Sequence, residues 1–524
     1  MTDRLGRPID SVPVAARSMA DQLGPPALPA SNTRGRLAAA LRQFWPAWLA
    51  LLPVVAIWFW ARQRMILNSP VYGQLFIDNP IVDAGWLQGR LTAIGVLGRY
   101  LGLLVLPHTL SCDYSYNQIP LYGEAPHWWQ EMYVWVSLGV VATLLATAAI
   151  RRRASPSFAW GVLFFFVMVL PTANLVMPIG SIMAERFLYL PSIGFCLVAA
   201  LALEAAGPAW PRLTRVLPAL VVAVFALRTH VRNADWQSEL VLWRSAVGAA
   251  PESFKTHKGY ANALWDAGRD EPAIDAAIAS AEMGLGIIDR TPLTERRRDN
   301  TLFLDLGMYY RFKGDFADRR GQPGEARRFF QKSVDILLRA RDVDRWVNQA
   351  SRTASLKRGR PAEKITDVGN HRIYNELGFA WLRLGDWTKA DEAGQYARRL
   401  APGDPGGCLV TAAAHFGTGQ TDRAAVLLIA ALVLDPKNGE AWTNLVRCYE
   451  KLGVLPVPIT TVSNNRALND GNPLVRRQLN EACVEVARQF LETKRPEDAR
   501  ALREKAVTTY RVPPAMFPEM PGAH

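Results

Sequence analysis

The sequence predicts an all-α protein in which a polytopic transmembrane helical domain is followed by an α-solenoid of helical repeats. Two observations lead to this prediction. From about residue 44 to residue 227 the chain is a series of apolar blocks, and from about residue 230 onward it is polar, charged and periodic like amphipathic helices. The mean hydropathy of +0.01 therefore averages two different kinds of chain. This division excludes a soluble enzyme.

The N-terminal part begins with residues 1–43, which contain Pro, Gly, Ser and several Arg but no apolar run of signal-peptide length. We expect a disordered basic arm there. The next block, Phe44–Trp60, is just long enough, at about 1.5 Å per residue, to cross a hydrocarbon layer of about 30 Å. With the blocks that follow, it predicts a transmembrane domain of about five or six helices over residues 44–229. The later blocks lie at about 91–107, 131–150, 158–177, 187–206 and 213–228.

The topology of this domain follows from the arginines. Arg151, Arg152 and Arg153 come directly after the block 131–150, and the positive-inside rule places them in the cytoplasm. Counting blocks from there predicts that everything after Arg228 lies on the outer side of the membrane, in a periplasm or a lumen. The block 91–107 contains Arg99 and could instead be an amphipathic or re-entrant helix, so the side of the 74–88 loop stays open.

Three loops place polar residues beside helix-breaking prolines at the membrane edge. They are, in chain order, residues 76–80, 106–120 and 171–192. The third loop contains Glu185 and Arg186, an ionisable pair that is costly there unless it is paired, hydrated or bound to something. One interpretation is that Arg186 binds a lipid phosphate, because a guanidinium matches phosphate oxygens, with Glu185 orienting it. The other is a structural Glu–Arg pair that holds two helix ends together.

The first and second loops offer Asp78 and Asp113 as weak candidates for a catalytic carboxylate. Each also has a structural interpretation. Asp113 fits an Asx-type turn beside Ser115, and Asp78-Asn79-Pro80 fits the start of a turn, because Asn before Pro commonly begins one.

The C-terminal part repeats every 34 residues, most clearly through Gly385, Gly419 and Gly453. Small residues at fixed helical positions and a closing Pro at the same period are typical of tetratricopeptide repeats. We expect such a solenoid over residues 230–455 and a helical cap and tail over residues 456–524. The polar stretch Asp342–Asp367 is predicted to be a loop or insertion.

A solenoid of this kind offers a concave groove for a protein or peptide partner. Asn375, Asn444 and Arg447 are the candidate groove residues. The net charge of +13 does not indicate nucleic-acid binding. The arginine clusters lie in the N-terminal arm, at Arg151–Arg153 and in amphipathic repeat helices, without an aromatic-interleaved groove or a known nucleic-acid motif. The five cysteines form no C-x-x-C pair and the seven histidines show no metal spacing, so no metal site is predicted.

Several motifs together resemble those of the transmembrane and tetratricopeptide-repeat containing (TMTC) family, protein O-mannosyltransferases of the GT-C fold. The similar segments are Asp78-Asn79-Pro80, Leu110-Ser111-x-Asp113-Tyr114-Ser115, Ala184–Ser192 and Arg232-Asn233-x-Asp235-Trp236. The resemblance covers roughly residues 72–453. It implies a polyisoprenyl-phosphate sugar as donor, an outward-facing site, membrane lipid as a partner, and a Ser or Thr hydroxyl of a protein as acceptor.

The resemblance also implies a departure. The family carries a pair of acidic residues after its first transmembrane helix, and a carboxylate in the first outward loop acts as general base in GT-C enzymes. This chain contains no Asp-Asp pair, and the N-terminal part of the family's membrane domain is expected to be missing from it. Two alternatives follow: a glycosyltransferase-related protein, or a non-catalytic membrane-anchored repeat scaffold.

Overall fold

The computed structural model describes residues 76–291, 301–454 and 472–520, except for single positions between 358 and 366, together with isolated residues between 53 and 61. The chain forms two compact units, Met1–Val71 and Tyr72–His524, and the account below concerns the second. The expected basic arm and most of the block Phe44–Trp60 lie outside the described residues, so these predictions are not tested.

The apolar part of the second unit contains five α-helices joined by loops and short 3-10 turns. The turn η2 (Pro80–Asp83) begins at the end of the first loop named from the sequence, and the turns η3 (Leu170–Thr172) and η4 (Glu185–Leu188) both lie at the third loop. The helices are α3 (Trp86–Val105), α4 (Trp128–Arg151), α5 (Pro156–Val169), α6 (Pro191–Ala206) and α7 (Pro211–Ala234).

Two of the expected blocks are too long. The block predicted at 158–177 ends as α-helix at Val169, because Pro171 follows within the turn η3. The block predicted at 187–206 begins as α-helix only at Pro191, where a proline suits the first helical turn. The last helix, in contrast, continues beyond the predicted residue 228 to Ala234, so that Arg228 and Arg232 lie on the same helix.

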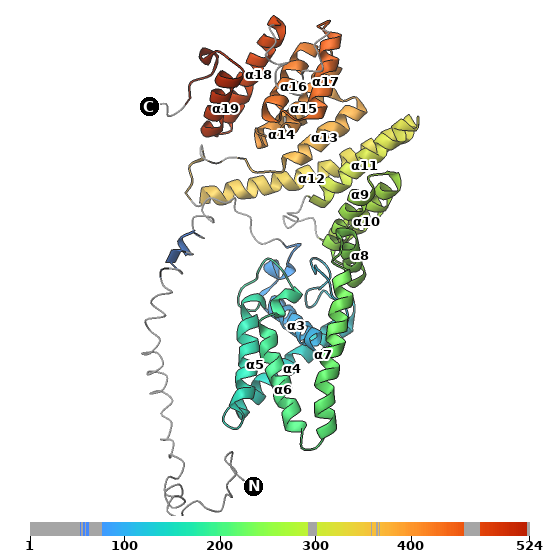
Figure 1. Cartoon of the computed structure of the whole chain (residues 1–524), viewed down its shortest axis with the longest axis vertical. Helices are drawn as coiled ribbons and strands as arrows, with labels where there is room; N and C mark the ends of the chain where they lie inside the picture. Colours follow the sequence, from blue (N-terminus) through green and yellow to red (C-terminus); the bar gives the residue numbers. More distant parts are fainter. Residues whose placement is uncertain are drawn as a thin grey trace, which may run out of the picture. The chain divides into compact units, whose positions relative to one another are not determined.

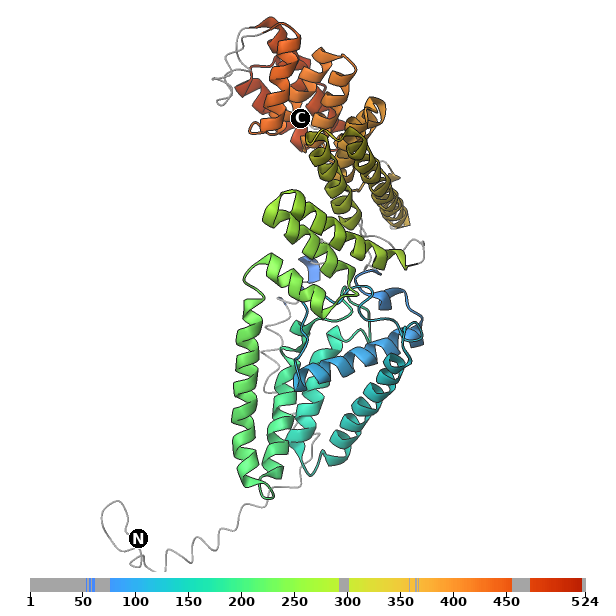
Figure 2. The same ribbon diagram turned by 90° about the vertical axis from the view of Figure 1, so that its right-hand side faces the viewer.

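Within the described residues, two helices are long and apolar enough to cross a membrane, namely Trp128–Arg151 and Thr214–Ala234. Only 17% of the first apolar window and none of the second is buried by protein, so both present apolar surface outward. Shorter apolar helices occur at Pro156–Thr172 and Pro191–Ala206. Helix α3, which contains Arg99, does not belong to either group and runs across the other helices rather than along them (Figure 2).

The polar part is a series of helices packed in sequential pairs, and the described residues contain no β-strand (Figure 1). The predicted all-α fold with helical repeats is therefore confirmed. The helices are α8 (Glu239–Ala249), α9 (Phe254–Gly268), α10 (Glu271–Asp289), α11 (Thr301–Arg319), α12 (Pro323–Lys357), α13 (His371–Leu384), α14 (Trp387–Leu400), α15 (Gly406–Gly417), α16 (Thr421–Leu434), α17 (Gly439–Lys451), α18 (Pro473–Glu492) and α19 (Pro496–Thr509).

The glycines that set the 34-residue period have a structural reason. Gly385 caps α13 with a left-handed backbone, at a φ of 81°. Gly419 and Gly453 have φ values of 85° and 69° at the corresponding turns. A position with a left-handed backbone at the end of a helix favours glycine, because glycine has no Cβ that would clash with the neighbouring backbone.

The prediction of a loop over Asp342–Asp367 is wrong for its first half, because α12 continues through it to Lys357. The buried face of this long helix changes along its length from apolar residues to Asp344, Ser351 and Ser355. Oδ1 of Asp344 accepts a hydrogen bond of 2.7 Å from the backbone N–H of Asn370, the residue that caps α13. A buried face made of polar residues resembles a loop in sequence, which explains the error.

The loops of the apolar part pack directly against the helix pair α9 and α10, which we call the first repeat. Phe76, Ile77 and Tyr116 share one hydrophobic core with Phe254 of α9. The backbone N–H of Asn117 donates to the carbonyl of Glu252 (2.7 Å), and the N–H of Phe254 donates to the carbonyl of Tyr116 (2.9 Å). We call this contact between residues 76–78 and 113–118 on one side and residues 252–255 on the other the loop–repeat junction.

Candidate functional site

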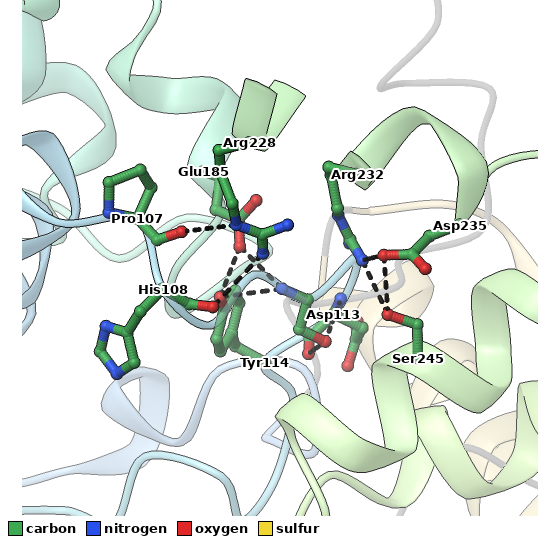
Figure 3. A network of polar contacts seen from close by, with 10 residues as sticks. Pro107, His108, Asp113, Tyr114, Glu185, Arg228, Arg232, Asp235 and Ser245 are labelled. Carbon is green, nitrogen blue, oxygen red and sulfur yellow. Dashed lines mark hydrogen bonds and ion pairs between the residues drawn. The ribbon is translucent and has the colours of Figure 1, made fainter. Parts of the chain in front are cut away.

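Glu185 connects the second and third loops. It is the first residue of η4, and its Oε1 accepts hydrogen bonds from the backbone N–H of Ser111 (2.7 Å) and the hydroxyl of Tyr114 (2.6 Å). Residues more than 70 positions apart are joined here by one carboxylate oxygen (Figure 3). The sequence placed Glu185 beside Arg186 only as a neighbour in the chain, and the structure shows where its carboxylate is used.

The environment of this carboxyl shifts its titration. Burial raises the pKa of Glu185 above the ordinary glutamate value, although the hydrogen bonds from Tyr114 and Ser111 and the charges of Arg232 and Arg228 act in the opposite direction. Burial likewise raises the pKa of Tyr114, and the negative charge of Glu185 adds to this effect. Both groups are therefore held in a partly dehydrated site at the end of the helices.

Two arginines at the end of α7 complete this polar cluster (Figure 3). Nε of Arg228 donates to the carbonyl of Pro107 (3.1 Å) and its Nη2 to that of His108 (3.3 Å). Arg232 is buried and pairs with Asp235 at 2.7 Å, with a further hydrogen bond of 2.8 Å to Ser245. Arg228 was not among the predicted site residues. Its spacing of four residues from Arg232, which places both on one helix face, is the signal that could have found it.

Arg186 lies beside this cluster but is not tied into it. Its side chain is exposed, and its guanidinium carbon lies 5.2 Å from the centre of the Phe187 ring. Among the described residues it has no carboxylate partner within ion-pair distance, and the hydrogen bonds given above for Glu185 go to Ser111 and Tyr114. The geometry leaves a guanidinium at the surface that can still receive an anion.

The two aspartates considered for catalysis are held in structural contacts. Oδ1 of Asp113 accepts from the N–H of Ser115 (2.8 Å) and from the hydroxyl of Ser253 (2.8 Å), and Oδ2 accepts from the Ser115 hydroxyl (3.0 Å). This is the Asx-type turn that the sequence offered as the alternative. Asp78 forms an ion pair with Lys255 of α9. Both carboxylates belong to the loop–repeat junction.

Asn79 and Asn174 form a buried polar pair that the sequence did not single out as such. The amide nitrogen of Asn79 donates to Oδ1 of Asn174 (2.9 Å) and to the carbonyl of Ile179 (2.8 Å). The amide nitrogen of Asn174 in turn donates to the carbonyls of Ser181 and Ile182. Because buried polar groups need partners, this pair fixes the first loop against the third. It explains why these motifs contain asparagines.

The repeats contain a groove of about 810 Å³ lined mainly by α11, α13, α15 and α17, with Leu428 contributed by α16. Asn444 and Arg447 are among its lining residues, and their role in binding a partner stays a prediction. Asn375 does not belong to its lining; its side chain is buried and donates to Asp404 at 3.2 Å. The described residues contain no group of three or more potential metal ligands.

The structure combines an apolar helical domain with helical repeats, and the loops of the domain pack onto the repeats. This combination is that of a membrane protein that carries a repeat solenoid. No protein-family model matches the chain. The protein O-mannosyl-transferase Tmtc3 of Drosophila melanogaster is 30% identical over 207 residues, which are 38% of this chain and 22% of the relative. TMTC1 of Mus musculus is 33% identical over 205 residues, and TMTC4 of Homo sapiens is 30% identical over 178 residues. Over 33–38% of its length, the chain is therefore similar to these TMTC protein O-mannosyl-transferases.

The matches cover only part of each relative. The chain spans 22% of the length of the first two of these relatives and 24% of the third. Among solved structures, the TPR2AB domain of yeast Sti1 in its pHSP90 complex covers 52% of this chain at 14% identity, with a TM-score of 0.16.

Proposed function

We propose that this chain is a multi-pass membrane protein of GT-C type, related to the protein O-mannosyltransferases that use a polyisoprenyl-phosphate sugar. Its repeats, on the outer side of the membrane, hold a polypeptide that carries the acceptor hydroxyl. The observation that supports this most strongly is the loop–repeat junction. It fixes the repeats to the first and second loops, and Glu185 in turn binds the second loop to the third loop, which carries Arg186. A polypeptide held in the groove would therefore be tethered to the part of the protein that carries the proposed donor site.

Arg186 is the residue proposed to contact the lipid phosphate. It is exposed and without a carboxylate partner among the described residues, and its planar fork suits phosphate oxygens. Glu185 would act indirectly, by fixing η4 and the second loop through Ser111 and Tyr114. This modifies the role first expected for Glu185, which was to orient Arg186 directly.

The test is sugar transfer by the full chain in lipid nanodiscs. The protein is given radiolabelled mannose on a polyprenyl phosphate and an unstructured peptide rich in Ser and Thr. The proposal predicts labelled peptide, and at least about a tenfold loss of donor binding in Arg186→Ala, since a charge-assisted contact to phosphate is worth about 1.5–3 kcal/mol. The matched control is Arg212→Ala, an exposed arginine in the first turn of α7.

A membrane-anchored scaffold without chemistry is the second candidate. The observation that favours it is the engagement of both candidate carboxylates, Asp78 with Lys255 and Asp113 with Ser115 and Ser253. The same experiment separates the two. Peptide binding without donor binding would support the scaffold, whereas donor binding that depends on Arg186 would support the transferase-related protein.

A further inference from the structure

The groove of the repeats has one aromatic wall. Phe312 of α11, Phe379 of α13 and Phe416 of α15 line it, and all three rings are partly exposed. Aromatic side chains bury a large apolar area when a ligand covers them. This wall can therefore receive apolar side chains of an extended segment.

The charges at the α11–α13 end of the groove are already neutralised. Arg311 pairs with Glu376 at 2.8 Å and with Asp315 at 3.3 Å. Arg383 pairs with the same Asp315 at 2.6 Å. A charged group of a ligand would have to compete with these ion pairs. This end of the groove therefore distinguishes little between acidic and basic ligands.

The α17 end differs. Arg447, which lines the groove, donates only a long hydrogen bond of 3.4 Å to Asn444. Lys451 lies just outside the lining residues, with its Nζ 4.6 Å from the centre of the Phe416 ring, which does line the groove. Neither cation pairs with a carboxylate among the described residues. Because they are four positions apart, they lie on one face of α17. Glu440, the acidic lining residue of the same helix, lies about two turns before Arg447.

We propose that the groove binds an extended polypeptide segment in which an acidic side chain stands next to an aromatic or aliphatic one. The carboxylate meets Arg447 and Lys451, and the apolar side chain covers Phe416 and Phe379. A basic segment is disfavoured because its charge would face two cations that form no ion pair with a carboxylate among the described residues. This inference rests on the proposed role of the repeats in holding a polypeptide, and it names the chemistry of that polypeptide.

The test measures the fluorescence anisotropy of labelled twelve-residue peptides with the full chain in nanodiscs. Three peptides share one sequence and differ only at the residue beside a central Phe, which is Asp, Asn or Lys. We expect affinity to fall in the order Asp, Asn, Lys. The double variant Arg447→Glu with Lys451→Glu should lower the affinity for the Asp peptide several-fold and by up to about 25-fold, since each exposed ion pair contributes up to about fivefold.

Two further variants make the result specific. Phe416→Ala should weaken all three peptides, while Arg500→Glu, an exposed charge reversal on α19 outside the groove lining, should weaken none. Because Arg447 and Lys451 are exposed, their reversal should leave the circular dichroism spectrum unchanged. Equal binding of the three peptides, or unchanged binding by the double variant, would overturn the charge assignment and leave the proposed function standing. Failure of every peptide to bind would overturn both this inference and the role of the repeats.

Discussion

The hydroxyl of Ser253 donates a hydrogen bond of 2.8 Å to Oδ1 of Asp113, and these two residues are 140 positions apart in the chain. Asp113 belongs to a loop of the apolar helices, and Ser253 directly precedes the repeat helix α9. The contact is one of several at the loop–repeat junction. Asp113, which the sequence offered as a candidate catalytic carboxylate, therefore holds the apolar domain and the repeats together.

Replacing this carboxylate should loosen the junction. Asp113→Ala leaves the N–H and hydroxyl of Ser115 and the hydroxyl of Ser253 without their acceptor, which costs about 1–3 kcal/mol of unfolding free energy. Thermal unfolding of the full chain in detergent should show a lower Tm than wild type. Asp318→Ala, an exposed aspartate change on α11, should stay within about 0.5 kcal/mol. Equal Tm values for the two variants would contradict the role assigned to Asp113.

The packing side of the junction can be tested at Ile77, which is only 1% exposed within the core shared with the first repeat. Ile77→Ala should destabilise the protein by about 2–5 kcal/mol, and Ile77→Val by only about 0.5–1.5 kcal/mol. Hydrogen exchange of the α9 amides reports the effect directly. Faster exchange in α9 for the alanine variant is expected; unchanged exchange there would mean that the first repeat is stable without the loop.

Glu185 should make stability depend on pH. A carboxyl whose pKa is raised on folding binds more protons in the folded than in the unfolded protein, so stability falls as the pH rises through the raised value. Its contribution is fully present below the ordinary glutamate pKa of about 4.3. The Glu185→Gln variant should therefore lose less stability than wild type between pH 4.5 and pH 8, measured as Tm at each pH. Glu504→Gln, an exposed change on α19, should follow the wild-type profile, and a Glu185→Gln profile parallel to wild type would refute the assignment.

The repeats could be predicted well from the sequence because their signal is local. Gly385, Gly419 and Gly453 recur where each turn requires a left-handed backbone, so the period and the fold have the same cause. The helix α12 was missed over its second half because its buried face carries Asp344, Ser351 and Ser355. Hydrophobic periodicity cannot detect a face that is buried but polar.

The site was only partly predictable for a different reason. The motifs around Asp113 and Glu185 were found, but the contacts that define their roles come from distant segments, from Ser253 and from Tyr114 and Ser111 respectively. Asn79 and Asn174 are another such pair, 95 positions apart. A single sequence gives the residue types in a loop but does not show which distant donor satisfies each acceptor.

The most direct test of the account is the equilibrium binding of polyprenyl-phosphate mannose to the full chain in nanodiscs. We expect saturable binding by the wild type, at least about a tenfold loss in Arg186→Ala, partial retention in Arg186→Lys and no loss in Arg212→Ala. Absence of saturable binding by the wild type, or equal binding by wild type and Arg186→Ala, would contradict the central claim that the loop bearing Glu185 and Arg186 receives a lipid-phosphate sugar.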